Sequence, residues 1–131
     1  VRHFHFLNTH FGLGAAERRE QASVLLSEKW LGGIPENEPV VLCGDFNSRP
    51  GSSVYRRLAQ SLEDVWGRAG KIPIRPGFPS LRPFLRLDHI FLSNHFEVRQ
   101  VQVPQTATTV IASDHLPLCA ELVLPDTDAR L

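Results

Sequence analysis

Four short clusters place acid, amide or imidazole side chains directly beside apolar runs that are typical of β-strands. They are Asn8-Thr9-His10, Gly44-Asp45-Phe46-Asn47-Ser48, Asp88-His89 and Ser113-Asp114-His115. The end of a strand is where a rigid sheet presents functional side chains to the loop that follows. We therefore expect the chemistry of this chain to be carried by these four places.

The second cluster suits a phosphate group and a hard cation. Asp45 and Asn47 are two residues apart, so their side chains point the same way if the strand conformation extends to them. The carboxylate could hold Mg²⁺ or one of its waters, and the amide could donate a hydrogen bond to a phosphoryl oxygen. Asp, Asn and Ser also favour turns through local hydrogen bonds, so ordinary turn chemistry is the alternative interpretation.

Two other clusters predict an imidazole base. His115 could act as a general base if a carboxylate fixed its tautomer, and Asp88 could supply that carboxylate from a neighbouring strand. Adjacent residues of an extended segment point to opposite sides, so Asp114 would face a metal ion rather than share the role of His115. The alternative interpretation is that Asp114 caps a turn and His115 packs or faces solvent.

The remaining histidines carry weaker signals. His10 could protonate a leaving oxygen or grip the scissile phosphate, although a structural histidine at a strand end fits equally well. His3 and His5 form a His-x-His pair, a spacing that can bind a transition metal, but the sequence offers no third ligand nearby. His89 and His95 receive no functional assignment.

These clusters need a sheet to hold them, and the hydrophobic pattern of the chain predicts one. Alternating or continuous apolar runs predict strands, and apolar residues spaced three to four apart predict helices. The expected strands are 1–8, 39–43, 86–93, 96–103 and 116–124, and the expected helices are 15–31, with Trp30 in the core, and 54–60. Residues 70–83 are expected to form a loop. This order predicts a mixed α/β sheet in one domain, 1–124, followed by a flexible tail, 125–131.

Composition narrows the classes of function. The chain has 131 residues, 42% of them hydrophobic, and 14 basic residues balance 14 acidic ones. This composition is typical of a globular domain, and the zero net charge argues against a dedicated nucleic-acid clamp but not against a metal-assisted enzyme.

No apolar run reaches the roughly 20 residues of a membrane span. We expect a cytoplasmic location, with reduced and buried Cys43 and Cys119, although an N-terminal targeting region could be missing.

Taken in order, the runs NTHFG, GDFNSRP, RLDHIFLS and SDHLP resemble the endonuclease/exonuclease/phosphatase superfamily, the deoxyribonuclease I-like group. The similarity extends from about Val1 to Leu124, and Phe78-Pro79-Ser80 also looks like the small bacterial members. The resemblance implies hydrolysis of a phosphodiester or phosphomonoester by in-line attack of water, with Mg²⁺ or Mn²⁺ as cofactor. The substrate stays open between nucleic acid, a lipid headgroup and a small phosphodiester or nucleotide.

The resemblance also implies roles for single residues. Asp45 would orient and deprotonate the attacking water, and it would lie at the metal together with Asp114. His115 would be the imidazole that pairs with Asp88, and His10 would match the other histidine of the family's site. The expected substrate-binding residues are Asn8, Asn47 and Arg86.

Arg86 follows two other arginines, Arg75 and Arg82, which lie in the expected loop before it. Interleaved with phenylalanines, these arginines could form a small surface that contacts phosphate groups. A solvated connector stiffened by proline is the alternative interpretation of the same stretch.

The chain departs from the family in its length. Family members are longer, with a four-layer sandwich of two sheets between helices, and their first half supplies an Asn and a Glu metal ligand that have no counterpart here. The chain starts within a strand and has no methionine, so we expect the C-terminal half of such a domain, processed or excised at Val1. A half-sandwich would expose a sheet edge and an apolar face, which an N-terminal half chain or a second copy would cover. The alternative function is therefore a non-catalytic half-domain that acts through assembly.

Overall fold

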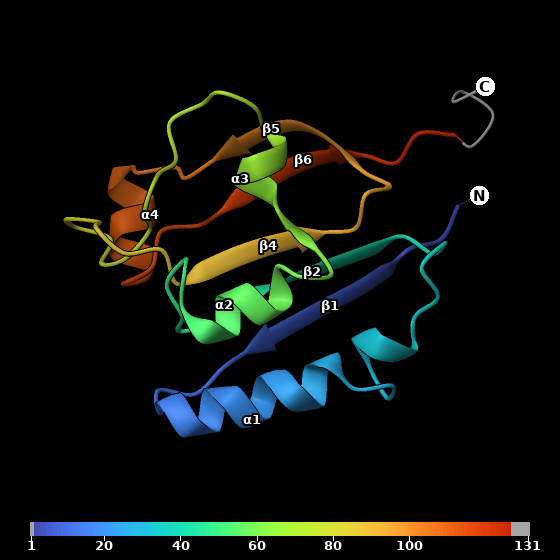
Figure 1. Ribbon diagram of the computed structural model, residues 1–131. Helices are drawn as coiled ribbons and strands as arrows, with labels where there is room; N and C mark the ends of the chain where they lie inside the picture. Colours follow the sequence, from blue (N-terminus) through green and yellow to red (C-terminus); the bar gives the residue numbers. More distant parts are fainter. Residues whose placement is uncertain (1, 127–131) are drawn as a thin grey trace.

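The computed structural model describes residues 2–126 and arranges them as two sheets with helices packed on the larger one (Figure 1). The strands are β1 (His5–His10), β2 (Val40–Asp45), β3 (Glu63–Asp64), β4 (Asp88–Leu92), β5 (Glu97–Gln102) and β6 (Cys119–Val123). The helices are α1 (Ala15–Leu26), α2 (Ser53–Leu58), α3 (Val65–Arg68) and α4 (Ala107–Ala112), with a short 3-10 turn, η1 (Leu31–Gly33). The predicted mixed α/β architecture is confirmed. Most of the expected tail, 125–131, lies outside the described residues.

The larger sheet has the strand order β1-β2-β4-β3, and β5 pairs with β6 in a separate antiparallel sheet. β1 runs parallel to β2, whereas β4 runs antiparallel to both β2 and β3. The carboxyl ends of β1 and β2 therefore meet the amino end of β4 at one edge of the molecule. In this register His10 pairs with Asp45, and Asp45 pairs with Asp88. The sheet itself places three of the predicted site residues in one row.

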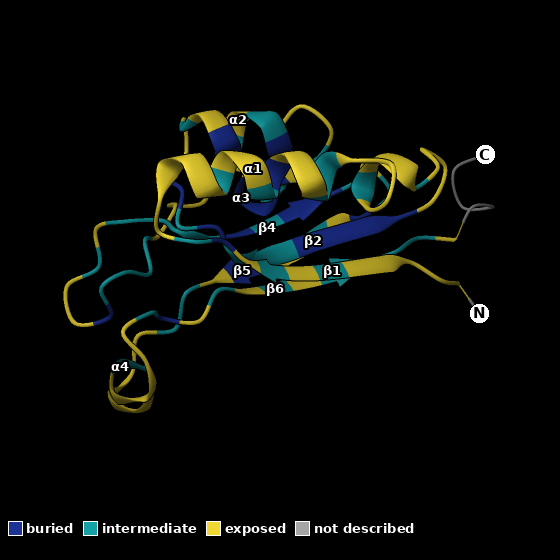
Figure 2. Ribbon diagram, turned by 90° about the horizontal axis from the view of Figure 1, so that it is seen from below, coloured by how far each residue is buried: buried dark blue, intermediate teal, exposed yellow. Residues whose placement is uncertain are grey.

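Each face of the larger sheet buries its own apolar cluster. On one face Leu42 and Phe91 pack with Ala22 of α1 and Leu58 of α2. On the other face the alternate residues of the same strands, among them Leu92, pack against α3, β5 and β6. Figure 2 shows α1 and α2 on one side of the strands and the β5–β6 sheet on the other. Because side chains alternate along a strand, the site row lies on the face that β5 and β6 share.

The first helix is shorter than its hydrophobic pattern predicts. α1 ends at Leu26, and the chain then folds back so closely that the backbone N–H of Gly32 donates to the carbonyl of Ser27. A Cβ at Gly32 would lie 2.5 Å from the carbonyl oxygen of Leu26, so this reversal requires a glycine. The prediction that Trp30 lies in the core is wrong, because its side chain is 50% exposed beyond the helix end.

Three short elements lie where no regular structure was expected. β3 and α3 together span only six residues, 63–68, and α4 has six. Elements of this length leave too few residues for a hydrophobic period to show. The expected burial of Cys119 is also wrong, because Cys119 is exposed and Cys43 is half-buried. None of the helices in residues 2–126 is long and apolar enough to cross a lipid bilayer.

Candidate active site

The row formed by β1, β2 and β4 brings an imidazole and two carboxylates together. The Nε2 atom of His10 lies 3.3 Å from Oδ2 of Asp45, and the His10 side chain is 75% exposed. The side chain of Asp45 is only 19% exposed. His10 therefore stands at the solvent side of a carboxylate that is largely enclosed.

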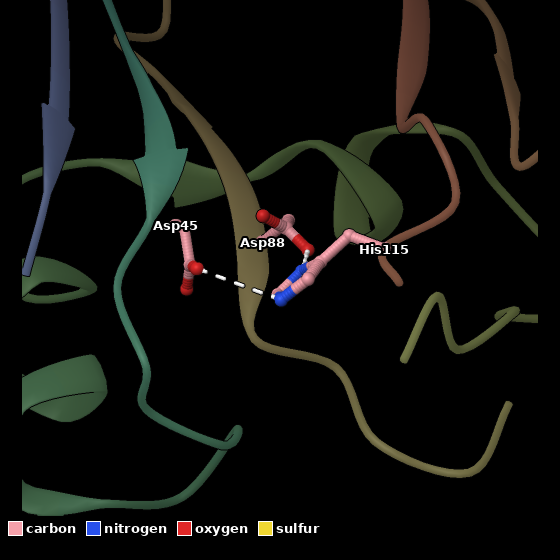
Figure 3. A group of neighbouring side chains, drawn as sticks. All are labelled: Asp45, Asp88 and His115. Carbon is pink, nitrogen blue, oxygen red and sulfur yellow. Dashed lines mark hydrogen bonds and ion pairs between the residues drawn. The ribbon is translucent and has the colours of Figure 1, made fainter. Parts of the chain in front are cut away.

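His115 completes the group from the segment between α4 and β6 (Figure 3). Its Nδ1 is 2.6 Å from Oδ2 of Asp88, and its Nε2 is 3.7 Å from Oδ2 of Asp45. Because the carboxylate of Asp88 accepts the hydrogen bond, Nδ1 carries the proton and the lone pair of neutral His115 is on Nε2, toward Asp45. The structure thus brings together the predicted pair of Asp88 and His115, although 27 residues separate them.

Burial and charge act in opposite directions in this group. Burial lowers the pKa of His115, but the hydrogen bond and negative charge of Asp88, with the charges of Asp45 and Asp114, outweigh burial and leave the pKa raised. Burial raises the pKa of Asp88, against the effect of His115 and with the help of the negative charge of Asp45. The site therefore favours a positive charge near the two carboxylates.

The loop before β4 fixes the position of His115, a role that the sequence did not reveal. The backbone N–H of Ser80 donates to the carbonyl of Asp114, and that of Leu116 donates to the carbonyl of Gly77, so these bonds bracket His115 on both sides. The ring of Phe78 lies 4.7 Å from the imidazole, centroid to centroid. The sequence predicted a loop here and a resemblance of Phe78-Pro79-Ser80 to small bacterial relatives, but not these contacts with the segment around His115.

Asn47 lies in a tight turn directly after β2. Its φ of 46° is in the left-handed region, which Asn tolerates better than most residues. Its backbone N–H donates to Oδ1 of Asp45, and its side-chain Nδ2 donates to the carbonyl of Phe11. The predicted turn chemistry is therefore present at Asn47, and its predicted phosphate-binding role stays a prediction.

A hollow of about 440 Å³ opens beside the group. Polar residues that line it include Asn8, Asp45, Asp88, Ser113 and His115, and the apolar part of its lining includes Ile90, Leu116 and Leu118. The exposed Asn8 shares this hollow with the carboxylates, and its substrate-binding role stays a prediction.

Two predicted site residues lie outside this group. The guanidinium of Arg86 is 2.6 Å from Oδ2 of Asp64, at the start of α3, and its side chain is 14% exposed. Asp114 is exposed and interacts with His115 through its charge. His5 is exposed and pairs with Glu38, so it lies apart from Asp45 and Asp88.

The donor set fits a divalent cation. Asp45, Asp88 and His115 each offer a ligand atom, and these atoms all lie within 4.8 Å of one another. Carboxylate oxygens are the donors that Mg²⁺ and Mn²⁺ prefer, and a cation would relieve the repulsion between the two acids. Nδ1 of His115 is engaged with Asp88, so Nε2 would be its ligand atom, and the two carboxylates are the harder donors that Mg²⁺ prefers.

Comparison with known sequences shows which family the chain resembles. The sequence model described as "Endonuclease/Exonuclease/phosphatase family" matches residues 1–115. The chain is 35% identical over 121 residues to the uncharacterized protein YbhP of Escherichia coli strain K12, covering 92% of this chain and 46% of YbhP.

Solved structures give the same result. The mannosyl-6-phosphatase Bt3783 of Bacteroides thetaiotaomicron is similar over 93% of this chain and 52% of its own, with 26% identity and a TM-score of 0.78. An endonuclease/exonuclease/phosphatase family protein of the same organism matches 92% of this chain and 50% of its own, with 26% identity and a TM-score of 0.72. The chain thus spans about half the length of the proteins it matches.

Proposed function

Because the chain belongs to the endonuclease/exonuclease/phosphatase family, we propose that it carries one side of a phosphoesterase site that hydrolyses a phosphodiester or phosphomonoester with activated water. The observation that supports this most directly is the line of Asp88, His115 and Asp45, in which an imidazole lies between two carboxylates. The similarity of the chain to a mannosyl-6-phosphatase supports the same class of reaction.

In this proposal the protons move through Nε2 of His115 and the carboxylate of Asp45. Asp88 accepts the Nδ1 hydrogen bond and keeps the lone pair of His115 directed at Asp45. A water held between the two could lose its proton while it attacks phosphorus. Asn47 and the exposed Asn8 would donate to phosphoryl oxygens, and His10 would serve the leaving oxygen from the solvent side.

Mg²⁺ or Mn²⁺ is the cofactor that we propose for this site. Asp45 and Asp88 would hold it, with Asp114 as the further ligand that the sequence suggests. When bound, a divalent cation polarises the phosphoryl oxygen and stabilises the charge that develops in the transition state.

The substrate class stays at the level of the phosphoester: a nucleic acid, a lipid headgroup or a small phosphodiester all present the group that this site would bind. A phosphate-binding role for Arg86 remains part of the proposal, and its ion pair with Asp64 is the competing structural role. A cytoplasmic location also belongs to the proposal, and the two free cysteines agree with reducing surroundings.

The second candidate is a non-catalytic half-domain that acts through assembly. β1 lies at the edge of the larger sheet; Phe6 within it is 61% exposed, and Phe4, just before it, is 49% exposed. An N-terminal half chain or a second copy would cover such a surface.

The test is hydrolysis of an activated aryl phosphodiester by the purified chain with Mg²⁺, with Mn²⁺ and with EDTA. The proposed function predicts turnover that requires the metal and that falls by about 100-fold or more in Asp45→Asn. The matched control is Glu121→Gln, which removes an exposed carboxylate from β6 and should leave the rate unchanged. Turnover that is equal in Asp45→Asn and the unchanged chain would contradict the proposal, and no turnover in any sample would favour the half-domain.

A further inference from the structure

His89 is fully enclosed on the helix side of the sheet, directly beside a site residue. It follows Asp88 in β4, and because side chains alternate along a strand the two point to opposite faces. Its residue is only 1% exposed. Its ring lies among Phe46, Tyr55 and Phe91, with ring centroids 5.1 to 5.9 Å away. A polar ring in such surroundings needs a reason to be there.

The polar contact of His89 reaches the turn that carries Asn47. Its Nε2 is 2.7 Å from the carbonyl oxygen of Ser48. A carbonyl can only accept, so Nε2 carries the proton and donates. Nδ1 has no hydrogen-bond partner among the described residues. The imidazole therefore acts here as a single, directed donor.

The turn that receives this bond holds two of the proposed site residues. It begins at Asp45, whose Oδ1 accepts the backbone N–H of Asn47, and the side chain of Ser48 donates to the carbonyl of Phe46. Asn47 adopts its left-handed φ within this turn. A backbone held away from its preferred region needs fixed contacts around it, and the bond from His89 to Ser48 provides one from the adjacent strand.

We propose that His89 is a positioning residue, which ties the Asp45–Ser48 turn to β4 so that Asp45 and Asn47 stay aligned with Asp88 and His115. The two neighbouring residues of β4 then have complementary tasks: Asp88 orients His115 on the site face, and His89 anchors the turn from the opposite face. The inference rests on the proposed function, since it concerns the alignment of the same site.

The cost of losing this anchor follows from the geometry of the reaction. Misplacing a reacting group by about 1 Å can slow an enzyme by about 100-fold. Replacing His89 with an apolar residue would leave the Ser48 carbonyl without this hydrogen-bond donor, so the turn would become more mobile. The expected result is a fall in kcat of about 10- to 100-fold with little change in KM, because the alignment matters most in the transition state.

Three substitutions at position 89 distinguish the effect of the N–H donor from the effect of ring size. His89→Gln keeps an N–H donor near the place of Nε2, so it should restore most of the kcat that His89→Leu loses. His89→Asn keeps a polar side chain but ends short of Ser48, so it should behave like His89→Leu and serves in its place if the leucine variant fails to fold. The control is His3→Gln, an exposed histidine whose loss should leave kcat unchanged.

Amide hydrogen exchange provides a readout that does not depend on turnover. In His89→Leu the Asn47 amide should exchange at least about 10-fold faster than in the unchanged chain, whereas the Leu42 amide in β2 should keep its rate. His89→Gln should restore protection of Asn47. Unchanged exchange at Asn47 in His89→Leu, or equal losses in the Gln and Leu variants, would overturn the proposal.

The two measurements also separate this inference from the proposed function. If the unchanged chain shows no metal-dependent turnover, the proposed function fails for this chain, and the exchange rates of Asn47 still decide whether His89 holds the turn. If turnover is present and depends on Asp45 but not on the donor at position 89, the phosphoesterase proposal stands and the role of His89 is refuted.

Discussion

At the scale of single residues, the site depends on an imidazole that lies between two acids. Asp88 and Asp45 lie on opposite sides of His115, with contacts of 2.6 Å at Nδ1 and 3.7 Å at Nε2. The negative charges of Asp88 and Asp45 raise the pKa of His115. The hydrogen bond from Nδ1 to Asp88 leaves Nε2 as the nitrogen that can accept a proton. The carboxylate of Asp88 therefore sets the orientation of His115 and is the first cause of its raised pKa, to which the charges of Asp45 and Asp114 add.

The first prediction concerns the protonation of His115. Asp88→Asn removes a negative charge and weakens the hydrogen bond, so the pKa of His115 should fall below its value in the unchanged chain. The stability that protonated His115 contributes is complete below about pH 6.5 and is lost as the pH rises through its raised pKa. In Asp88→Asn this contribution should be smaller, and its loss should be complete at a lower pH. The measurement is an NMR titration of the His115 ring in EDTA, and a pKa that stays the same or rises would contradict it.

The second prediction separates the backbone of Asn47 from its amide. Asn47→Gly and Asn47→Ala both remove the side-chain bond to the Phe11 carbonyl and the proposed phosphate donor, so both should lower kcat/KM to a similar extent. Only alanine is strained at a φ of 46°, so it should lower the free energy of unfolding by about 1 kcal/mol more than glycine does. Urea unfolding checks the difference. Equal stabilities would show that the turn relaxes around alanine.

At the scale of elements, strand ends bring the site together and a loop completes it. β1, β2 and β4 place His10, Asp45 and Asp88 in one row, and this part was predictable because each cluster follows or begins an apolar run. The pairing of His115 with Asp88 was also predicted, but the contacts that hold His115 in place were not, because they are hydrogen bonds between the chain at 77–80 and at 114–116. Hydrophobic periodicity reports which face of an element is buried, but it carries no information on contacts between two irregular segments.

Two further differences from the sequence predictions also arise from tertiary packing: the early end of α1 and the role of His89. α1 ends at Leu26 rather than Leu31, because the close return of the chain at Gly32 overrides the helical spacing of the apolar residues. His89 received no assignment because a single histidine in a strand shows neither its burial nor its partner 41 residues away. Local pattern thus predicted the polar clusters at the strand ends, and tertiary packing decided which other residues contact them.

The third prediction tests what joins α3 to β4. Arg86, two residues before β4, pairs with Asp64, the cap of α3, and Asp64 also accepts the hydroxyl of Tyr55. Arg86→Met would leave a largely buried carboxylate without its cation, so the free energy of unfolding should fall by about 3 kcal/mol. Chemical denaturation measures this loss. A raised KM with unchanged stability would instead support phosphate binding by Arg86.

At the scale of the whole molecule, β1 is both the edge of the sheet and one wall of the candidate site. The described residues offer no strand to pair with its outer edge, and much of β1 is exposed (Figure 2). Phe6 is 61% exposed and, by the alternation of side chains along a strand, lies on the same face as His10. The proteins that the chain matches are about twice as long. This exposed edge, with Phe6 beside it, is the surface that the assembly proposed above would cover.

The last prediction is that this edge drives self-association when the chain is studied alone. Burying a phenylalanine side chain is worth about 1.5–3 kcal/mol, so Phe6→Lys should weaken association by about 10-fold or more. Because Phe6 is already exposed, the substitution should leave the thermal stability of a single copy unchanged. Leu13→Lys is the matched control, since Leu13 is 84% exposed but lies in the loop beyond β1, and it should associate like the unchanged chain. Sedimentation velocity over a range of concentrations compares the three. If the unchanged chain stays monomeric, or if both variants weaken association equally, β1 is not the contact, and a closed fold of this chain alone would then have to position Asp45, Asp88 and His115 for the reaction.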